Sequence, residues 1–316
     1  MRREFIMSFF VGIDVGGTSV KGIVTDASGK AYAEGSTPFK TQTLAEDTAA
    51  LCKQLILKSG CPTGEVKGIG IGCAGMIDSG NGAVVFAGNL GLKNYPLAKL
   101  VREATGFPVK ITNDANAAAL GEATFGAGKN YADSIFVTLG TGVGGGIIIG
   151  GKLFEGYKSV GAEIGHTVIE YGGEKCTCGR RGCFEAYASA TALTKQTKRA
   201  MEEDTGSAMW KLCTSETATA KTAFDCMDSD VTARRVVERY INYLACGLVN
   251  LANTFRPQVI MLGGGISNQG ENLIAPLRKK FDKELFGGVH YAPVKIVRAS
   301  LGAAAGVYGA AALAMQ

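Results

Sequence analysis

The chain has 316 residues, of which 46% are hydrophobic and 19% are charged, and this balance excludes a disordered or low-complexity protein. Its 45 glycines are about twice the number expected at the average usage of roughly 7%, but the 7 prolines and the lack of a Gly-X-Y period exclude collagen. The net charge of +5 comes from scattered basic residues, and no apolar run approaches the roughly 20 residues of a membrane span. We therefore expect neither a nucleic-acid nor a membrane partner.

The nine cysteines are of two kinds. Six are isolated in segments that predict helix or strand, as is typical of reduced core cysteines in a cytoplasmic protein: Cys52, Cys61, Cys73, Cys213, Cys226 and Cys246. The other three are clustered within residues 176–183 and indicate a different use. We therefore expect a cytoplasmic location.

The N-terminal part of the chain predicts an α/β unit. In chain order we expect strands at 9–14, 19–25 and 31–37, a helix at 43–59, strands at 66–73 and 109–112, and an Ala-rich helix at 113–125. Gly-Gly-Thr joins the first two strands, and Asp-Ala-Ser-Gly joins the next pair. This order of three strands, a helix and further strands predicts an α/β unit.

A similar pattern then restarts. We expect strands at 134–140, 146–149 and 152–154, and later a strand at 259–262, a helix at 271–286, a strand at 294–299 and an Ala-rich helix at 301–314. Residues 184–256 contain only Gly206 and Gly247 and predict a helical insertion that Pro257 ends. The repeat predicts two α/β domains around a cleft: a small domain at 8–118 plus 302–316, and a large one at 119–301.

Three glycine-rich turns, at 14–18, 140–146 and 263–265, follow predicted strands. Without Cβ atoms such turns can present backbone N–H groups to phosphate or lie flat against adenosine, and Asp14 could hold Mg²⁺ through water. The second turn is neither a Walker A loop nor a Rossmann fingerprint, and any one turn alone could be an ordinary hairpin. The predicted nucleotide-binding residues are Asp14, Gly16, Gly17, Thr18, Lys21, Gly140, Thr141, Gly142, Gly264 and Gly265.

Asn113 and Asp114 stand between a predicted strand and a predicted helix. A helix cap accounts for an Asp at this place on local grounds. The alternative is a general base beside the cleft, with Asn113 orienting a substrate hydroxyl.

Cys176, Cys178 and Cys183 form a compact thiol loop, and His166 lies ten residues before the first of them. Structural Zn²⁺ prefers four thiolate and imidazole ligands, so this set predicts a zinc site in a loop at 166–183. A reduced thiol loop, or a disulfide with one thiol left over, are the alternatives. Glu163 and Glu185 bracket this loop, and carboxylates accept hydrogen bonds from sugar hydroxyls well.

Taken together, these motifs resemble the ROK family of sugar kinases and repressors. The motifs are Asp14-x-Gly-Gly-Thr, Asn113-Asp114, Gly140-Thr-Gly-x-Gly-Gly, Gly161-x-Glu-x-Gly-His and Cys176-x-Cys-Gly-x-x-Gly-Cys-x-Glu. The resemblance covers nearly the whole chain. It implies duplicated ribonuclease-H-like (actin-like ATPase) domains around a closing cleft, use of ATP and Mg²⁺, and a homodimer or a dimer of dimers.

The resemblance also implies roles for individual residues. Asp114 would take the proton of a hexose hydroxyl, most simply the 6-hydroxyl. Asn113, Glu163, His166 and Glu185 would bind the sugar, with His166 also binding zinc through its other ring nitrogen. Gly75 and Asn89 are further candidate sugar contacts. Leu92 departs from the family, because it stands where Trp is usual.

The function this implies is ATP-dependent phosphorylation of a hexose, with glucose as the first candidate. N-acetylmannosamine, N-acetylglucosamine, fructose and allose are alternatives, and the sequence leaves open whether polyphosphate could replace ATP. A sugar-responsive repressor would need a helix-turn-helix domain, whereas only about eight residues precede the first strand. A sugar-binding regulator without catalysis is the remaining alternative.

Overall fold

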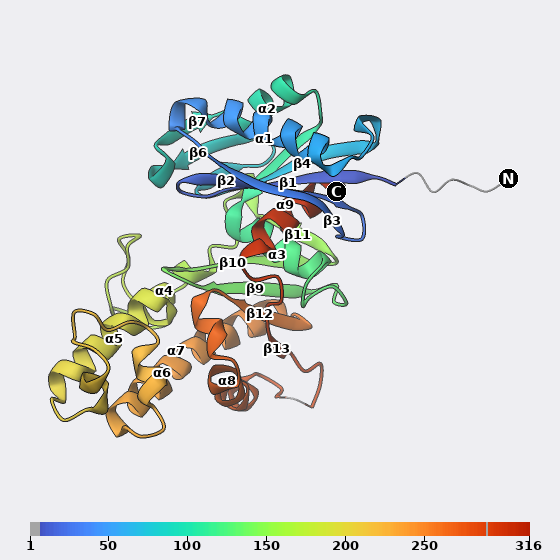
Figure 1. Cartoon of the computed structure of the whole chain (residues 1–316). Coiled ribbons are helices and arrows are strands. Elements are labelled where there is room, and N and C mark those ends of the chain that lie inside the picture. Colours follow the sequence, from blue (N-terminus) through green and yellow to red (C-terminus); the bar gives the residue numbers. More distant parts are fainter. Residues whose placement is uncertain (1–6, 289) are drawn as a thin grey trace. The chain divides into compact units, whose positions relative to one another are not determined.

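The computed structural model describes residues 7–288 and 290–316 (Figure 1). They form two compact units. Unit 1 comprises the described residues through Ala132 together with Gly146–Ala162 and Ser300–Gln316, and unit 2 comprises Asp133–Gly145 and Glu163–Ala299. The predicted boundary at residue 118 falls inside helix α3 (Asp114–Thr124), all of which belongs to unit 1.

The first sheet has the strand order β3-β2-β1-β4-β8. Its strands are β1 (Phe9–Val15), β2 (Ser19–Asp26), β3 (Ala31–Pro38), β4 (Val66–Cys73) and β8 (Val109–Asn113). β1 pairs with β2 antiparallel and with β4 parallel, and β8 extends the parallel side. The predicted strands lie within a residue or two of these bounds.

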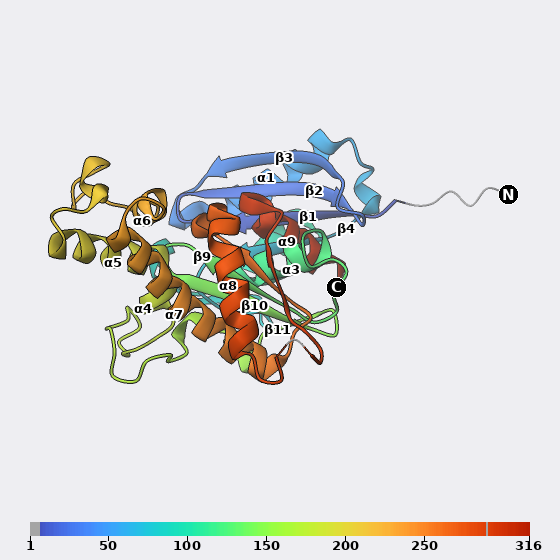
Figure 2. The same cartoon turned by 90° about the horizontal axis from the view of Figure 1, so that it is seen from below.

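The alternation of side chains along β1 explains how this sheet is covered. Phe9, Val11 and Ile13 belong to the core that helix α1 (Leu44–Ser59) closes, whereas Phe10 packs against helix α9 (Ala305–Met315). Successive strand residues point to opposite faces, so one strand serves two layers (Figure 2). A further helix, α2 (Leu97–Thr105), packs against α1.

Several glycines of unit 1 allow α9 to approach the sheet and α3 closely. A Cβ on Gly12 would lie 2.0 Å from the carbonyl oxygen of Val307, and one on Gly70 would lie 1.8 Å from that of Ala310. A Cβ on Gly309 would lie 1.6 Å from the carbonyl oxygen of Ala117. Part of the glycine surplus therefore serves helix packing rather than ligand binding.

A small third sheet of unit 1 was not predicted. It has the order β5-β6-β7, with β5 (Met76–Asp78), β6 (Ala83–Ala87) and β7 (Leu92–Tyr95). These strands have only three to five residues, which is too short for a clear alternation. Leu92, in β7, is 4% exposed and belongs to the core of unit 1.

The second sheet has the order β11-β10-β9-β12-β13. Its strands are β9 (Ser134–Leu139), β10 (Val143–Ile149), β11 (Lys152–Phe154), β12 (Val259–Gly263) and β13 (Lys295–Arg298). The prediction that the glycine-rich turn extends to Gly146 is wrong, because β10 already begins at Val143. A Cβ on Gly145 would lie 2.4 Å from the carbonyl oxygen of Phe136 in β9, so the strand itself needs that glycine.

The predicted helical insertion is present. It contains α4 (Glu185–Ala188), α5 (Ala190–Glu203), α6 (Thr222–Cys226) and α7 (Val231–Phe255), and α8 (Glu271–Glu284) follows β12. Ser189 caps α5 and Asp230 caps α7 with their side-chain oxygens. α7 ends at Phe255, two residues before Pro257, in agreement with the prediction that Pro257 ends this helix. None of the helices that the structure describes combines the length and hydropathy needed to cross a lipid bilayer.

Candidate functional site

Two aspartates of unit 1 lie where parallel strands end. Asp14 is the penultimate residue of β1, and Asp114 follows β8 directly. Cys73 ends β4 between them, paired with Val15 on one side and Asn113 on the other. Burial, together with the charges of Asp114 and Asp14, raises the pKa of Cys73 to about 12. Both carboxylates therefore act on the same small region at this edge of the sheet.

The environment of Asp14 disfavours its ionised form. Burial raises its pKa, the charge of Asp114 adds to the increase, and Lys21, its cross-strand partner on β2, opposes it. The first turn of α9 approaches the same carboxylate, since a Cβ on Gly306 would lie 2.9 Å from Asp14 Oδ2. Sequence reasoning missed Gly306, because nothing in an Ala-rich helix distinguishes that glycine.

Asn113, rather than Asp114 as the sequence suggested, caps α3. Its Oδ1 accepts a hydrogen bond from Ala115 N at 2.8 Å, and its Nδ2 donates to the carbonyl oxygen of Gly75 at 3.0 Å. Gly75 has φ +115°, and a Cβ there would lie 2.5 Å from the carbonyl oxygen of Phe86. Asn113 and Gly75 are thus joined by a contact that fixes the loop after β4.

Asp114 is exposed, and its Oδ1 accepts a hydrogen bond from the N–H of Ala115 at 2.9 Å. Within residues 7–288 and 290–316, its Oδ2 has no hydrogen-bond partner. Asp114 Oδ2 is therefore available to a ligand. A residue that only capped the helix would not need a free carboxylate oxygen. Asn89 is also exposed, in the turn Gly88–Leu90 just before β7.

The glycines of the three predicted nucleotide turns differ in what they do. A Cβ on Gly17, Gly140 or Gly265 would meet no atom within 4 Å, so packing does not require a glycine at these places. Gly264, with φ +80°, passes so close to β9 that a Cβ would lie 2.5 Å from the carbonyl oxygen of Leu139. At these three open positions, neither packing nor a positive φ accounts for the glycine.

In unit 2, the predicted zinc ligands converge. One donor atom from each of His166, Cys176, Cys178 and Cys183 lies within 4.8 Å of all the others. The Sγ atoms of Cys178 and Cys183 are 3.7 Å apart, and all three thiols are free of disulfides. Zn–S bonds of about 2.3 Å place two tetrahedral sulfur ligands about 3.8 Å apart, so these residues fit a zinc ion.

Glu185 lies beside this cysteine cluster and is held from two sides. Its Oε1 accepts a hydrogen bond from Thr177 Oγ1 at 3.0 Å, and its Oε2 accepts one from Val143 N at 3.2 Å. A Cβ on Gly142 would lie 2.3 Å from Oε2, so Gly142 leaves the space that this carboxylate occupies. The cluster, Glu185 and the turn at 140–142 therefore form one connected group.

Glu163 precedes the turn Ile164–His166, and its carbonyl oxygen accepts a hydrogen bond from His166 N at 3.0 Å. Its side chain is exposed, while Ile164 and Gly165 are buried. A Cβ on Gly165 would lie 2.0 Å from the carbonyl oxygen of Val143. The buried part of this turn thus anchors the backbone from which Glu163 and His166 project.

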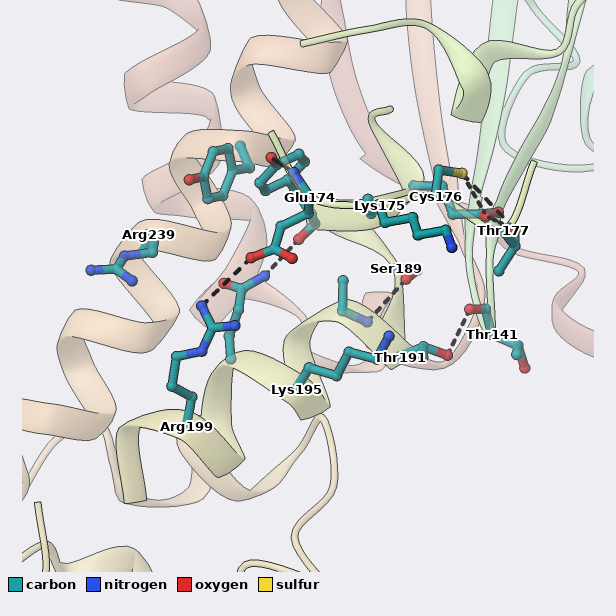
Figure 3. Close-up of a pocket in the computed structure, with 16 residues that line it drawn as sticks. Thr141, Glu174, Lys175, Cys176, Thr177, Ser189, Thr191, Lys195, Arg199 and Arg239 are labelled. Atoms are coloured by element: carbon teal, nitrogen blue, oxygen red, sulfur yellow. Dashed lines mark hydrogen bonds and ion pairs between the residues drawn. The ribbon is translucent and has the colours of Figure 1, made fainter. Parts of the chain in front are cut away.

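A cavity of about 140 Å³ lies wholly within unit 2 (Figure 3). Cys176, Thr177 and Glu185 line it on one side, and Thr141 of the glycine-rich turn also reaches it. Side chains of α5, among them Lys195 and Arg199, line the other side. The sequence did not single out these α5 residues, because a charged helical face is usually solvated surface.

The chain matches the model of the ROK family over residues 10–316. It is 35% identical to a glucokinase of Streptomyces coelicolor over 98% of both chains. Among solved structures, a ROK hexokinase from Thermus thermophilus superposes with a TM-score of 0.83 at 31% identity, covering 97% of this chain and 98% of that one. A ROK family glucokinase from Streptomyces griseus, in complex with glucose and AMPPNP, gives a TM-score of 0.78 at 35% identity over 98% and 100% of the two chains.

Proposed function

The chain belongs to the ROK family, and from this premise we propose that it transfers a phosphoryl group from Mg-ATP to a hexose, with glucose as the first candidate. The observation that carries the proposal is the Asp14–Asp114 pair at one edge of the first sheet, with Asp114 Oδ2 available to a ligand. The glucokinase relatives and the solved structure with glucose and AMPPNP support the same reaction.

In the proposed reaction the 6-hydroxyl oxygen of the sugar attacks the γ-phosphorus of ATP. The bond between that phosphorus and the β,γ-bridging oxygen breaks, and ADP leaves. Asp114 takes the hydroxyl proton, which typically contributes about 10²–10⁴-fold to the rate. Asp14 would bind the Mg²⁺ of Mg-ATP through water. Its raised pKa reflects the free-energy cost of ionising a buried carboxyl group, which a bound cation would offset.

We assign the sugar contacts to exposed or half-buried polar groups around these elements. Asn113, with Gly75 behind it, and Asn89 come from unit 1. Glu163, His166 and Glu185 come from unit 2. Carboxylates that are held in place by other hydrogen bonds, as Glu185 is, orient sugar hydroxyls at little cost in side-chain entropy.

The nucleotide is assigned to the glycine turns. Its phosphates lie against Gly16, Gly17 and Thr18 with Lys21 nearby, and against Gly140, Thr141 and Gly142, while Gly264 and Gly265 face the adenosine. The open positions of Gly17, Gly140 and Gly265 support this assignment. Catalysis of phosphoryl transfer is mainly positioning and charge neutralisation, which such backbone N–H groups provide.

Zinc is proposed to be structural and to be held by His166, Cys176, Cys178 and Cys183. When bound, it fixes the loop and the tautomer of His166, which leaves the other ring nitrogen for the sugar. The identical strand orders of the two large sheets support duplicated ribonuclease-H-like domains. A ligand cleft and a homodimer or dimer of dimers remain predictions; sedimentation velocity tests the oligomer.

The deciding experiment is a coupled ADP-release assay with Mg-ATP. The panel contains glucose, fructose, allose, N-acetylglucosamine and N-acetylmannosamine, with polyphosphate as a second donor. We expect glucose to give the highest kcat/KM. Sugar binding without ADP release from any member would instead support a regulator, and preference for an N-acetylhexosamine would change the assigned substrate.

A further inference from the structure

The cavity in Figure 3 contains two lysines without partners. Lys175 directly precedes the cysteine cluster, and Lys195 lies on α5; both are exposed. Across the described part of the chain, neither amino group makes a hydrogen bond or an ion pair. Two cations that share a cavity and have no counter-charge indicate a place for an anion.

The acidic residues of the same cavity do not neutralise these lysines. Glu174 forms an ion pair with Arg199 at 3.5 Å. Glu185 accepts hydrogen bonds from Val143 N and Thr177 Oγ1, as described above. Arg239 of α7 lines the cavity as well and adds a further positive charge.

Rigid contacts hold α5 against the glycine-rich turn. Thr191 Oγ1 donates a hydrogen bond to the carbonyl oxygen of Thr141 at 2.8 Å, and Ala190 N donates one to that of Gly140 at 2.8 Å. Lys195 follows Thr191 by four residues, so the two side chains share one face of the helix. The anchored first turn of α5 therefore directs Lys195 along the cavity that Thr141 lines.

We propose that Lys175 and Lys195 bind phosphate groups of an anionic ligand in this cavity, next to Thr141. The inference rests on the proposed function, in which Thr141 contacts the phosphates of ATP, and it adds unit 2 cations to that contact. The predicted nucleotide set contains Lys21 as its one basic residue beside the Mg²⁺ of Mg-ATP, whereas phosphoryl transfer requires the charge of several phosphate oxygens to be neutralised. Lys175 and Lys195 supply two more positive charges.

The test compares Lys175→Ala, Lys195→Ala and the double variant with the wild type. We expect the KM for ATP to rise about fivefold for each single variant and further for the double variant, since a hydrogen bond to a charged group is lost. The KM for the hexose should not change, and Lys195→Arg should retain most of the ATP affinity. Lys279→Ala, an exposed helical lysine of α8, is the matched control.

Tripolyphosphate carries phosphate groups without a nucleoside, so its affinity measures the contribution of the phosphates to binding separately from that of the nucleoside. We expect calorimetry to detect its binding to the wild type, more weakly at high salt, and to show at least a tenfold loss in the double variant. Unchanged ATP KM and unchanged tripolyphosphate affinity in the double variant would overturn the inference. This outcome differs from failure of the proposed function, in which the wild type itself releases no ADP with any sugar.

Discussion

The carboxylate of Glu185 accepts a hydrogen bond from the backbone N–H of Val143 at 3.2 Å, and this contact joins the cysteine cluster to the glycine-rich turn. The two segments are separated by more than 40 residues. Glu185, which we propose to bind sugar, therefore lies against the turn that we propose to bind phosphate. Changes on one side are therefore expected to affect the other.

Glu185→Gln keeps the size of the side chain but removes its charge. We expect the KM for the hexose to rise about tenfold, because a charge-assisted hydrogen bond becomes a neutral one, with a smaller rise in the KM for ATP through Val143. Steady-state kinetics with each substrate varied in turn checks this. Glu202→Gln, an exposed residue of α5, is the control, and an unchanged hexose KM in Glu185→Gln would contradict the assignment.

Asp114→Asn should lose most of the turnover and still bind the sugar. Asparagine preserves the hydrogen bond from Ala115 but cannot accept the hydroxyl proton, so kcat should fall by about 10²–10⁴-fold. Single-turnover kinetics measures the chemical step and calorimetry measures hexose binding, so the two effects are separated. Asp282→Asn on α8 serves as the control, and near-normal turnover in Asp114→Asn would rule out a general base here.

Asp14 should lower the stability of the fold at neutral pH. Its pKa is raised above the ordinary 3.8, mainly by burial, so the stability it contributes is fully present below 3.8 and is lost as the pH rises through the raised value. Asp14→Asn should therefore have the higher Tm at pH 7, with the difference shrinking toward pH 4. The same variant should lose activity with Mg-ATP. A Tm difference that does not depend on pH would show that the ionisation of Asp14 is not what lowers the stability.

The cysteine cluster should contain about one zinc ion per chain, which elemental analysis measures directly. Cys183→Ser alters a buried ligand and should release the metal, and the hexose KM should then rise more than the ATP KM, because His166 and Glu185 lose their support. Hydrogen exchange should show lost protection in the loop between them. A metal-free protein with full activity would refute the zinc site.

Glu122, fully buried in α3, should be important for stability. Its carboxylate accepts hydrogen bonds from Ala127 N at 2.9 Å, Ser300 N at 3.0 Å and Leu301 N at 2.6 Å. Glu122→Gln turns one acceptor into a donor that faces an N–H group, so we expect a loss of about 2 kcal/mol in the free energy of unfolding. Urea unfolding measures it, with exposed Glu103→Gln as the control. A loss no larger than in that control would contradict this role.

The sequence by itself determined what depends on neighbours along the chain. The glycine-rich turn after β1 and the Cys-x-Cys spacing of the cysteine cluster could each be predicted from a few neighbouring residues. The start of α3 could be predicted as well, although the structure places its cap at Asn113 rather than at Asp114. The short strands β5, β6 and β7 could not, because three to five residues carry too little alternation.

Tertiary structure alone decided the contacts between segments that are distant along the chain. Glu122 meets Ser300 across 178 residues, and Glu185 meets Val143 across 42. Only the folded backbone shows that Gly12, Gly70 and Gly309 make room for a helix, whereas a Cβ on Gly17, Gly140 or Gly265 would meet no atom within 4 Å. In sequence all six are simply glycine. What surrounds the missing Cβ distinguishes a glycine that helix packing requires from one that it does not.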